Sequence, residues 1–339
     1  MRWFSKASTQ AMTAAMLAFF AGLNYAASFP LPPTGQDLIG KVQNVSAKYE
    51  DTLLDIARKY GLGYEEIIAA NPGVDPWIPG EGTPVTIPTQ FILPPGERNG
   101  IVINLAELRL YYYPPTEDQV ITHPLGIGRE GWATPTGQMK IIEKRAKPSW
   151  RVPKSIRQEH AAKGEPLPAV VPPGPDNPLG QFAMRLSQSQ YLLHGTNQPW
   201  GVGMRVSHGC IRLYPEDIKT LFPQVPIGTP VKIINQPYKA GWLGETLFIE
   251  AHPPLSEESA TEGNNLTPLV KAIITAYGDA RPKGTDIREA QKIATQQTGI
   301  PTSLAQALTY NESQPLEEAQ HYAAHFMRVE RALSIQQPD

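Results

Sequence analysis

Short apolar runs separated by turn residues dominate the middle of the chain. Residues 100–105 and 108–113 are rich in Val, Ile, Leu and Tyr, and Gly or Pro residues interrupt the pattern at short intervals. Such runs predict β-strands, and we expect further short strands at residues 120–121, 138–142, 191–194 and 230–234. Many short strands at this spacing are typical of a sandwich or barrel. We therefore predict that residues 97–236 form a mainly β domain of this kind.

A shorter segment ahead of this domain has helical periodicity. Apolar residues recur at helical spacing over residues 53–60, and a second helix is expected over residues 64–70. Short strands are expected near residues 42–45 and 84–88. A strand–helix–helix–strand unit of this length can bury only a small core. We predict a small α+β module over residues 40–90.

The chain changes character after residue 236. We expect a last hairpin over residues 241–250, followed by helices over residues 268–277, 285–298 and 315–335. This part of the sequence has no cluster of catalytic residue types. We predict that residues 237–339 form a hairpin and a helical C-terminal region, which acts as a structural cap or as a partner-binding appendage.

A long segment without a periodic pattern interrupts the β domain. It covers residues 143–179, and loops of this length inside a compact domain are usually functional or disordered. Residues 140–163 carry eight basic and two acidic side chains. This local positive charge fits either an ordinary solvated face or the rim of a site for an anionic ligand. We predict an irregular loop that lies over the site and excludes water from it.

The first residues have the pattern of an export signal. Arg2 and Lys6 precede an apolar run over residues 11–23, and small residues follow. This order is typical of a cleaved signal peptide, and the run is shorter than the roughly 20 residues that span a bilayer. We predict a signal peptide over residues 1–27, a proline-rich linker over residues 29–35, and no membrane span after cleavage.

Composition narrows the classes of function. Hydrophobic residues make up 41% of the 339 residues and charged residues 18%, and the net charge is −2. This is a globular composition without the overall positive field that recruits nucleic acid. The chain has one cysteine, Cys210, so an exported form has no internal disulfide. Because an exposed thiol is open to oxidation, the residues around Cys210 decide whether it is reactive or inert.

Residue types that acyl transfer requires gather in two short stretches, Leu193–Thr196 and Val206–Leu213. A cysteine nucleophile needs a base that takes its proton and donors that stabilise the oxyanion. We predict that Cys210 is the nucleophile and that His194, at the end of a predicted strand, is the base. The backbone N–H groups of Gly209 and Cys210 are candidates for an oxyanion hole.

Neighbouring residues complete the predicted site. We expect Ser207, His208, Gly209 and Arg212 to shape it, and we expect Arg212, Gly195 and Thr196 to contact substrate. Arg212 is suited to pair with a substrate carboxylate and to lower the pKa of the thiol.

Cys210 has three other interpretations. Zinc could bind Cys210 and histidines, with His123 or His160 as a further ligand, but no C-x-x-C or H-x-x-x-H spacing favours it. A redox sensor would lack a resolving cysteine. The third interpretation is a buried, inert cysteine that behaves as a small hydrophobic residue. We predict neither a metal nor a cofactor.

The catalytic motifs resemble those of the YkuD-type L,D-transpeptidases of bacterial cell walls. The resemblance rests on His194–Thr196 and Ser207–Arg212 and extends over about residues 97–236, including Gly126–Gly128, Thr134–Gly137 and Pro172–Leu179. It implies a YkuD-like fold. It also implies that Cys210 attacks the carbonyl of meso-diaminopimelate in a peptidoglycan tetrapeptide stem. D-alanine then leaves, His194 serves as general acid and base, and an amine resolves the thioester.

The module over residues 40–90 resembles LysM, a small glycan-binding unit of cell-wall proteins. The matching residues are Asp51–Leu53, Ile56–Ala57, Tyr60–Gly61, Ile67–Ile68, Ala70–Pro72 and Val85–Pro88. The module departs from the family at Glu50, where glycine is usual, and at the inserted residues 73–79. The resemblance implies binding to glycan strands, and a spacer of the same fold that binds no glycan is the alternative.

Three functions follow from these resemblances. Signal peptide, LysM-like module and catalytic domain together resemble the periplasmic ErfK/YbiS branch, which implies transfer to the C-terminal lysine of an outer-membrane lipoprotein. The same acyl-enzyme could instead form 3–3 crosslinks with a neighbouring stem. The third function, a non-catalytic wall-binding protein, is disfavoured by the complete Cys/His motif.

Overall fold

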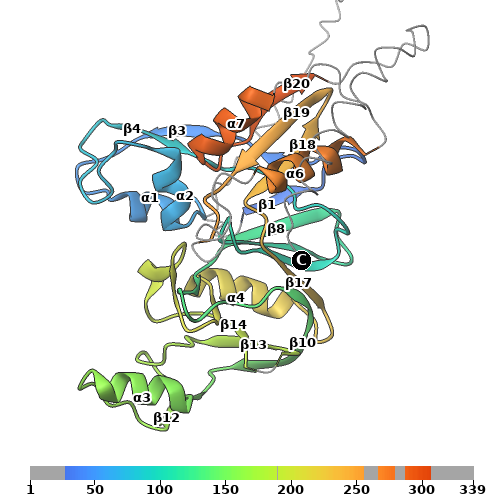
Figure 1. The fold of residues 1–339 in the computed structure, drawn as a ribbon. Coiled ribbons are helices and arrows are strands. Elements are labelled where there is room, and N and C mark those ends of the chain that lie inside the picture. Colours follow the sequence, from blue (N-terminus) through green and yellow to red (C-terminus); the bar gives the residue numbers. More distant parts are fainter. Residues whose placement is uncertain (1–26, 189, 256–265, 279–286, 307–339) are drawn as a thin grey trace, which may run out of the picture.

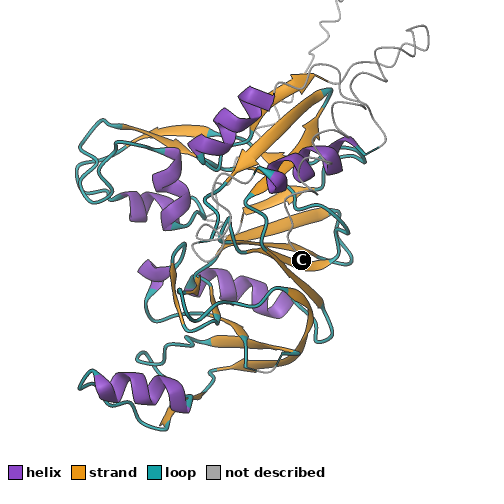
Figure 2. Cartoon of the chain, in the orientation of Figure 1, coloured by secondary structure: helices purple, strands orange, loops and turns teal. Residues whose placement is uncertain are grey.

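The computed structural model describes residues 27–188, 190–255, 266–278 and 287–306. The predicted signal peptide, except for its last residue, and the predicted helix over residues 315–335 lie outside these ranges. The described chain has three parts: a small N-terminal module, a central β domain and a C-terminal part (Figures 1 and 2). Among the described residues, no helix combines the length and apolar character needed to cross a membrane.

One curled sheet of nine strands forms the central domain (Figure 1). The order across it is β1-β8-β7-β6-β17-β10-β13-β14-β16. These strands are β1 (Ala27–Pro30), β6 (Gly100–Asn104), β7 (Arg109–Tyr113), β8 (Gln119–Pro124), β10 (Gly137–Ala146), β13 (Phe182–Leu186), β14 (Leu192–His194), β16 (Ile211–Arg212) and β17 (Pro230–Ile234). The predicted mainly β character is confirmed, and the strands form one curled sheet.

The sheet curls around α4 (Pro215–Gln224), whose apolar face fills its concave side (Figure 1). Ile101 and Ile103 of β6 pack in this core with Ile218 and Leu221 of α4, and all four side chains are fully buried. Between them, Val102 points to the other face of β6 and joins a second core. Burial on both faces explains why β6 and β7 are continuous apolar runs without alternation.

The second core joins the N-terminal module to the sheet. The module consists of β3 (Gln43–Ser46), α1 (Leu53–Lys59), α2 (Tyr64–Ala70) and β4 (Pro84–Ile87), as the periodicity predicts. A capping box formed by Thr52 and Asp55 begins α1, because each side chain accepts the backbone N–H of the other residue. Leu53 and Ile67 of the module are buried in one cluster with Tyr111 of the sheet.

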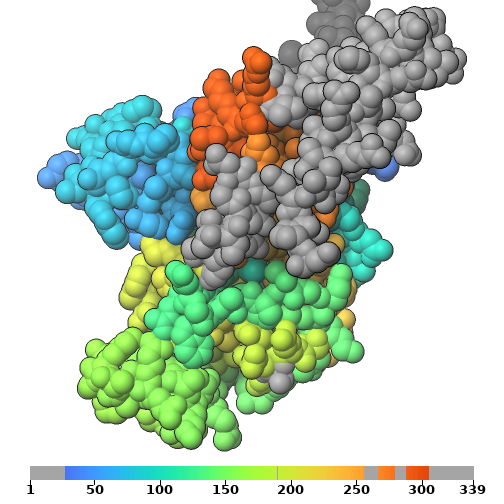
Figure 3. Space-filling view, viewed as in Figure 1, coloured from blue at the N-terminus to red at the C-terminus, as the bar shows by residue number. Residues whose placement is uncertain are grey.

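Polar contacts fix the module on the central domain. Arg109, fully buried on β7, donates from Nε and Nη2 to the Glu66 carboxylate of α2 at 2.8 Å. At the start of α2, the N–H of Glu65 donates to the carbonyl of Gly203 at 3.2 Å. A Cβ on Gly63 would lie 2.6 Å from the Gly203 Cα, so this close backbone contact requires glycine. Figure 3 shows the module packed against the rest of the molecule.

The C-terminal part is an α/β unit and not purely helical. Its three-stranded sheet is formed by β18 (Tyr238–Leu243), β19 (Thr246–Ala251) and β20 (Thr302–Gln306), and it packs with α6 (Thr267–Tyr277) and α7 (Ile287–Gln296). The predicted hairpin and the first two predicted helices are confirmed. The prediction missed β20, because this strand is short and gains its stability from pairing with the distant β19.

The predicted irregular loop over residues 143–179 is largely ordered, which corrects that prediction. β10 continues to Ala146, and β11 (Trp150–Arg151) pairs with β12 (Val170–Val171). Between them lies α3 (Lys154–Ala162), which projects at one end of the molecule (Figure 1). The periodicity missed α3 because Ile156 is its one buried residue.

The predicted linker over residues 29–35 also needs correction, because Phe29 and Pro30 belong to β1, which pairs with β8 at the edge of the sheet. An edge strand tolerates proline, since one row of its backbone groups has no partner strand. Four short strands complete the description: β2 (Leu38–Gly40) pairs with β5 (Gln90–Ile92), and β9 (Ile127–Gly128) pairs with β15 (Arg205–Ser207).

Candidate active site

Two parallel strands bring the predicted catalytic residues together. β14 and β16 pair with His194 opposite Arg212, and the Leu213 N–H donates to the His194 carbonyl at 2.9 Å. Cys210 directly precedes β16, so it lies at the end of that strand beside β14. The sheet register therefore joins two sequence motifs that lie apart in the chain.

His194 is held as a neutral base. Its side chain is buried, and Nδ1 lies 2.6 Å from the Gly195 carbonyl. A carbonyl can only accept, so Nδ1 carries the hydrogen and Nε2 keeps a free lone pair. Burial, together with the positive charge of Arg212, lowers the pKa of His194 to about 3. The imidazole is therefore neutral near pH 7 and able to accept a proton at Nε2.

Cys210 is a protonated thiol in this environment. Its Sγ lies 3.8 Å from the Gln190 carbonyl, to which the thiol donates. Burial raises the pKa of the Cys210 thiol, while the Leu192 N–H and the charge of Arg212 oppose this rise. The last two groups are placed to stabilise the thiolate once the proton leaves. A base is consequently needed for attack.

A turn fixed by hydroxyl groups shapes the backbone before Cys210. Ser207 Oγ donates to the Cys210 carbonyl at 2.6 Å and accepts the Gly209 N–H at 3.1 Å. Thr134 Oγ1 donates to the Gly209 carbonyl at 3.0 Å. Gly209 itself has φ +97°, and a Cβ there would lie 3.0 Å from the Tyr191 ring. This position therefore requires glycine for two independent reasons.

These contacts change the predicted oxyanion hole. The Gly209 N–H is already bound to Ser207 Oγ, so it is not free to stabilise an oxyanion in this conformation. The N–H of Cys210 has no acceptor among the described residues. Of the two predicted donors, the Cys210 N–H is therefore the one available.

Arg212 provides positive charge beside the thiol. Its pKa is lowered by burial and raised by the nearby Cys210. Its Nε is buried without an acceptor, and within the described ranges no carboxylate forms an ion pair with its guanidinium. This arrangement is suited to a carboxylate that enters with substrate.

Gly195 and Thr196 have packing roles in the described structure. A Cβ on Gly195 would lie 3.0 Å from Ile218 of α4, and buried Thr196 accepts the Gln198 N–H at its Oγ1 at 2.9 Å. These contacts give both residues a structural role in the turn that follows β14. Their predicted contact with substrate remains a prediction.

His208 lies in a charged network that the sequence did not reveal. Its Nε2 is 3.0 Å from Glu159 Oε2 of α3 and 3.1 Å from Arg129 Nη2, and its ring packs edge-on against Trp132 with centroids 4.8 Å apart. Burial lowers the pKa of His208, and Glu159 opposes this effect. Arg129, Trp132 and Thr134 lie in or near the family-like segments at 126–128 and 134–137, but no sequence signal points to Glu159.

Within the described ranges, the residues of the zinc alternative form no group with the spacing of metal ligands. His123 lies 3.2 Å from Asp217 inside the sheet, and His160 lies near Glu165 on the surface. In the described part of the chain, one group of side chains has the spacing of metal ligands: Glu107, Glu250 and His252. The Lys239 ammonium already contacts both glutamates of this group and lies 2.8 Å from Glu250. This cation makes the cluster an internal ion network, which a metal would have to displace.

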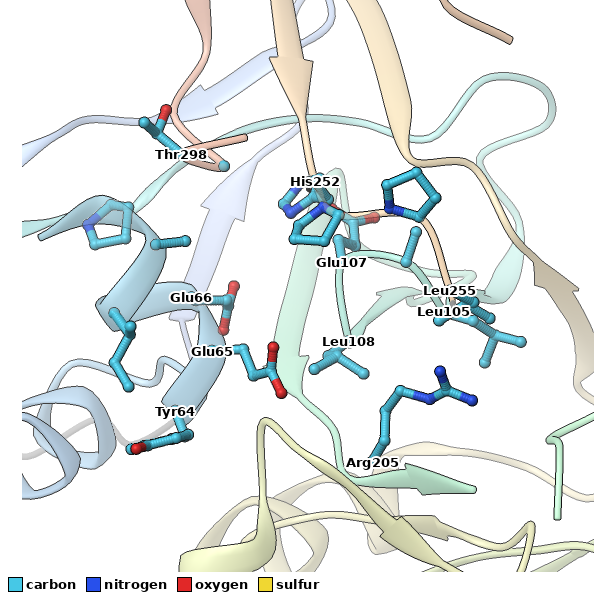
Figure 4. Close-up of a pocket in the computed structure, with 17 residues that line it drawn as sticks. Tyr64, Glu65, Glu66, Leu105, Glu107, Leu108, Arg205, His252, Leu255 and Thr298 are labelled. Carbon is cyan, nitrogen blue, oxygen red and sulfur yellow. Dashed lines mark ion pairs between the residues drawn. The ribbon is translucent and has the colours of Figure 1, made fainter. Parts of the chain in front are cut away.

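A cavity of about 450 Å³ lies away from Cys210, between α2, the β6–β7 turn and the C-terminal part (Figure 4). Glu65 of the module and Arg205 of β15 both point into it, and His252 lines its opposite side. Neither Cys210 nor His194 lines this cavity, so it is separate from the candidate active site.

Comparisons with known proteins agree with this geometry. Residues 98–233 match the model of the L,D-transpeptidase catalytic domain YkuD, and residues 46–76 match the LysM domain. "Probable L,D-transpeptidase YcfS" of Escherichia coli is 44% identical over 82% of this chain and 88% of its own length. The Escherichia coli proteins named "Probable L,D-transpeptidase YbiS" and "Probable L,D-transpeptidase ErfK/SrfK" are 42% and 39% identical, over 84% and 85% of this chain and 94% of each relative. The chain therefore belongs to the L,D-transpeptidase family and combines a YkuD catalytic domain with a LysM domain.

Proposed function

We propose that this L,D-transpeptidase acts in the periplasm with Cys210 as nucleophile and His194 as general acid and base. The observation that supports these roles best is the neutral His194, whose free Nε2 lies on the strand next to Cys210. We also propose the domain division given above: signal peptide 1–27, LysM module 40–90, catalytic domain 97–236 and C-terminal region 237–339.

The first half of the reaction forms a thioester. The Cys210 thiol gives its proton to His194 Nε2, and Sγ bonds to the carbonyl carbon of meso-diaminopimelate in the tetrapeptide stem. The oxyanion that forms accepts the N–H of Cys210. When the carbon–nitrogen bond breaks, His194 returns the proton to the amine of the departing D-alanine.

The second half transfers the acyl group to an amine. His194 Nε2 takes a proton from the attacking amine, a new amide bond forms, and the sulfur leaves and is reprotonated. Hydrolysis competes with this step, so exclusion of water favours transfer. We propose that the ordered segment from β11 to β12, which carries α3, limits water access. Its link to His208 through Glu159 supports this position.

The acceptor that we favour is the C-terminal lysine of an outer-membrane lipoprotein. Support comes from the shared domain order with the ErfK/YbiS branch and from identity over most of the chain to its members. We further propose that the LysM module binds glycan strands. It exposes Tyr49, Trp77 and Ile78 to solvent, and exposed aromatic rings are suited to stack on sugars.

The test is a reaction of the purified protein with disaccharide-tetrapeptide, with and without a peptide that ends in lysine. Mass spectrometry then identifies the products. We expect loss of D-alanine and a peptide-linked tripeptide product, both of which require Cys210. Crosslinked dimers in place of the peptide product would favour 3–3 crosslinking. No loss of D-alanine under either condition would contradict the proposal.

A further inference from the structure

One carboxylate beside the catalytic turn has an unusual number of partners. Both oxygens of Glu159 lie 2.7 Å from Arg129 Nη2, Oε1 also lies 2.7 Å from Lys163 Nζ, and Oε2 lies 3.0 Å from His208 Nε2. Lys163, Arg129 and His208 hold the pKa of Glu159 well below its usual range. These groups form a site for a carboxylate that is complete in the structure, and a side chain of the protein fills it.

Arg129 and His208 come from a different part of the fold than the carboxylate, whereas Lys163 caps the same helix as Glu159. Arg129 directly follows β9, and its N–H donates to the Ser207 carbonyl at 3.0 Å. His208 lies two residues before Cys210 and packs on Trp132. The backbone of Arg129 and the ring of His208 therefore both belong to the framework of the catalytic turn. Glu159 instead lies on α3, in the segment that projects from the domain (Figure 1).

When His208 carries its hydrogen on Nε2, the hydrogen bonds of the site are satisfied only when it contains an anion. Arg129 Nη2 and His208 Nε2 lie 3.1 Å apart, and a guanidinium can only donate. When His208 Nε2 donates to Glu159, the N–H groups of His208 and Arg129 lie next to each other, and the Glu159 carboxylate accepts from both. Arg129 Nε is also buried without an acceptor among the described residues. If α3 moved away, these donors would need another anion to bind.

We infer that Arg129 and His208 form a binding site for a carboxylate of the donor peptide, and that Glu159 competes with substrate for it. The inference rests on the proposed function, since the donor is the anionic peptidoglycan stem. Guanidinium groups bind carboxylates with two parallel hydrogen bonds, which fixes orientation as well as position. A donor held by Arg129 and His208 lies against the turn that carries Cys210. Arg212, deeper in the site, remains available for a second carboxylate.

The test compares donors that differ in one charge. The tetrapeptide stem and three derivatives, each with one carboxylate converted to an amide, are assayed for D-alanine release by the full-length protein. We expect one derivative to have kcat/KM about tenfold or more below the parent, because a hydrogen bond to an ionised carboxylate is stronger than one to a neutral amide. Arg129→Gln lowers kcat/KM for the parent about tenfold and removes the discrimination against that derivative.

Glu159→Gln tests the competition directly. Because this variant removes the competing charge of Glu159, we expect KM for the parent donor to fall several-fold. KM for the amide derivative with the lowered kcat/KM should not change. Lys154→Gln, an exposed charge change on the same helix outside the network, serves as the matched control and leaves both values as in the wild type. Circular dichroism and thermal unfolding confirm that each variant folds.

The alternative is that Glu159 only ties α3 to the domain. In that case Arg129→Gln keeps the full discrimination between acid and amide donors, or Glu159→Gln raises KM for both donors equally, and either result overturns the inference. Normal D-alanine release by the wild type without any discrimination also overturns it while leaving the proposed function intact. If the wild type releases no D-alanine from any donor, the proposed function itself fails.

Discussion

Gly209→Ala perturbs the catalytic turn at the residue directly before Cys210. Gly209 has φ +97°, a conformation that costs an L-residue with a side chain about 1–2 kcal/mol. The added methyl group would also lie 3.0 Å from the Tyr191 ring and 3.5 Å from the Trp132 carbonyl. The ring must therefore move, or the turn must shift, and overpacking of this kind costs about 1–3 kcal/mol.

Gly228→Ala is the matched control. Gly228 has φ +93°, and a Cβ there meets no atom within 4 Å. This variant therefore has nearly the same backbone strain without the contact. We expect urea denaturation to show a loss of about 1–2 kcal/mol for Gly228→Ala and a larger loss for Gly209→Ala.

Acylation separates the two variants further. A shift of the turn moves Cys210 Sγ and the Cys210 N–H relative to His194, and a displacement of about 1 Å can reduce a rate about 100-fold. We expect the rate of thioester formation to fall at least about tenfold in Gly209→Ala and to stay near the wild-type value in Gly228→Ala. Equal acylation rates in the two folded variants would refute the argument that Gly209 positions the nucleophile.

Three further predictions concern protonation, domain docking and water exclusion. The pKa of His194 is about 3 when folded and about 6.5 when unfolded, so between these values only the unfolded state binds the proton and stability falls as pH falls. His194→Gln should therefore lose less stability than the wild type between pH 7 and 4.5 in urea denaturation, and equal losses would contradict the assignment. Arg109→Met leaves the Glu66 carboxylate without its buried partner and should cost about 3–5 kcal/mol, with part of the loss recovered when Glu66→Gln is added; no recovery would argue against the pair. Replacement of residues 151–171 by a short Gly–Ser linker should raise the ratio of hydrolysis to transfer in the mass-spectrometric assay, and unchanged partitioning would remove the role of this segment in excluding water.

Local patterns predicted most of the elements. The helices of the N-terminal module lie where the apolar spacing predicts them, within about one residue at each end. Six strands of the central sheet also follow their predicted apolar runs, namely β6, β7, β8, β10, β14 and β17. α3, α4, β13 and β20 were not predicted. β20 depends on a distant partner strand, and α3 buries little apart from Ile156. Elements that depend on tertiary contacts leave a weak signal in the local sequence.

The features of the candidate site were also predicted only in part. Cys210, His194 and Arg212 were found from residue types and spacing, because acyl transfer needs these groups close together. The tautomer of His194 depends on the Gly195 carbonyl, and the occupied Gly209 N–H depends on Ser207 Oγ. Glu159 was missed altogether, since it reaches His208 across a gap of 49 residues in the sequence. These features follow from the folded geometry and not from a motif.

The central claim is that the reaction proceeds through a thioester on Cys210. Intact-mass spectrometry of the protein mixed with disaccharide-tetrapeptide, without an acceptor amine, tests it most directly. The account predicts that the protein gains the mass of the stem without its terminal D-alanine, that the increment maps to Cys210, and that it is absent in Cys210→Ala. D-alanine release by Cys210→Ala at the wild-type rate would contradict the claim.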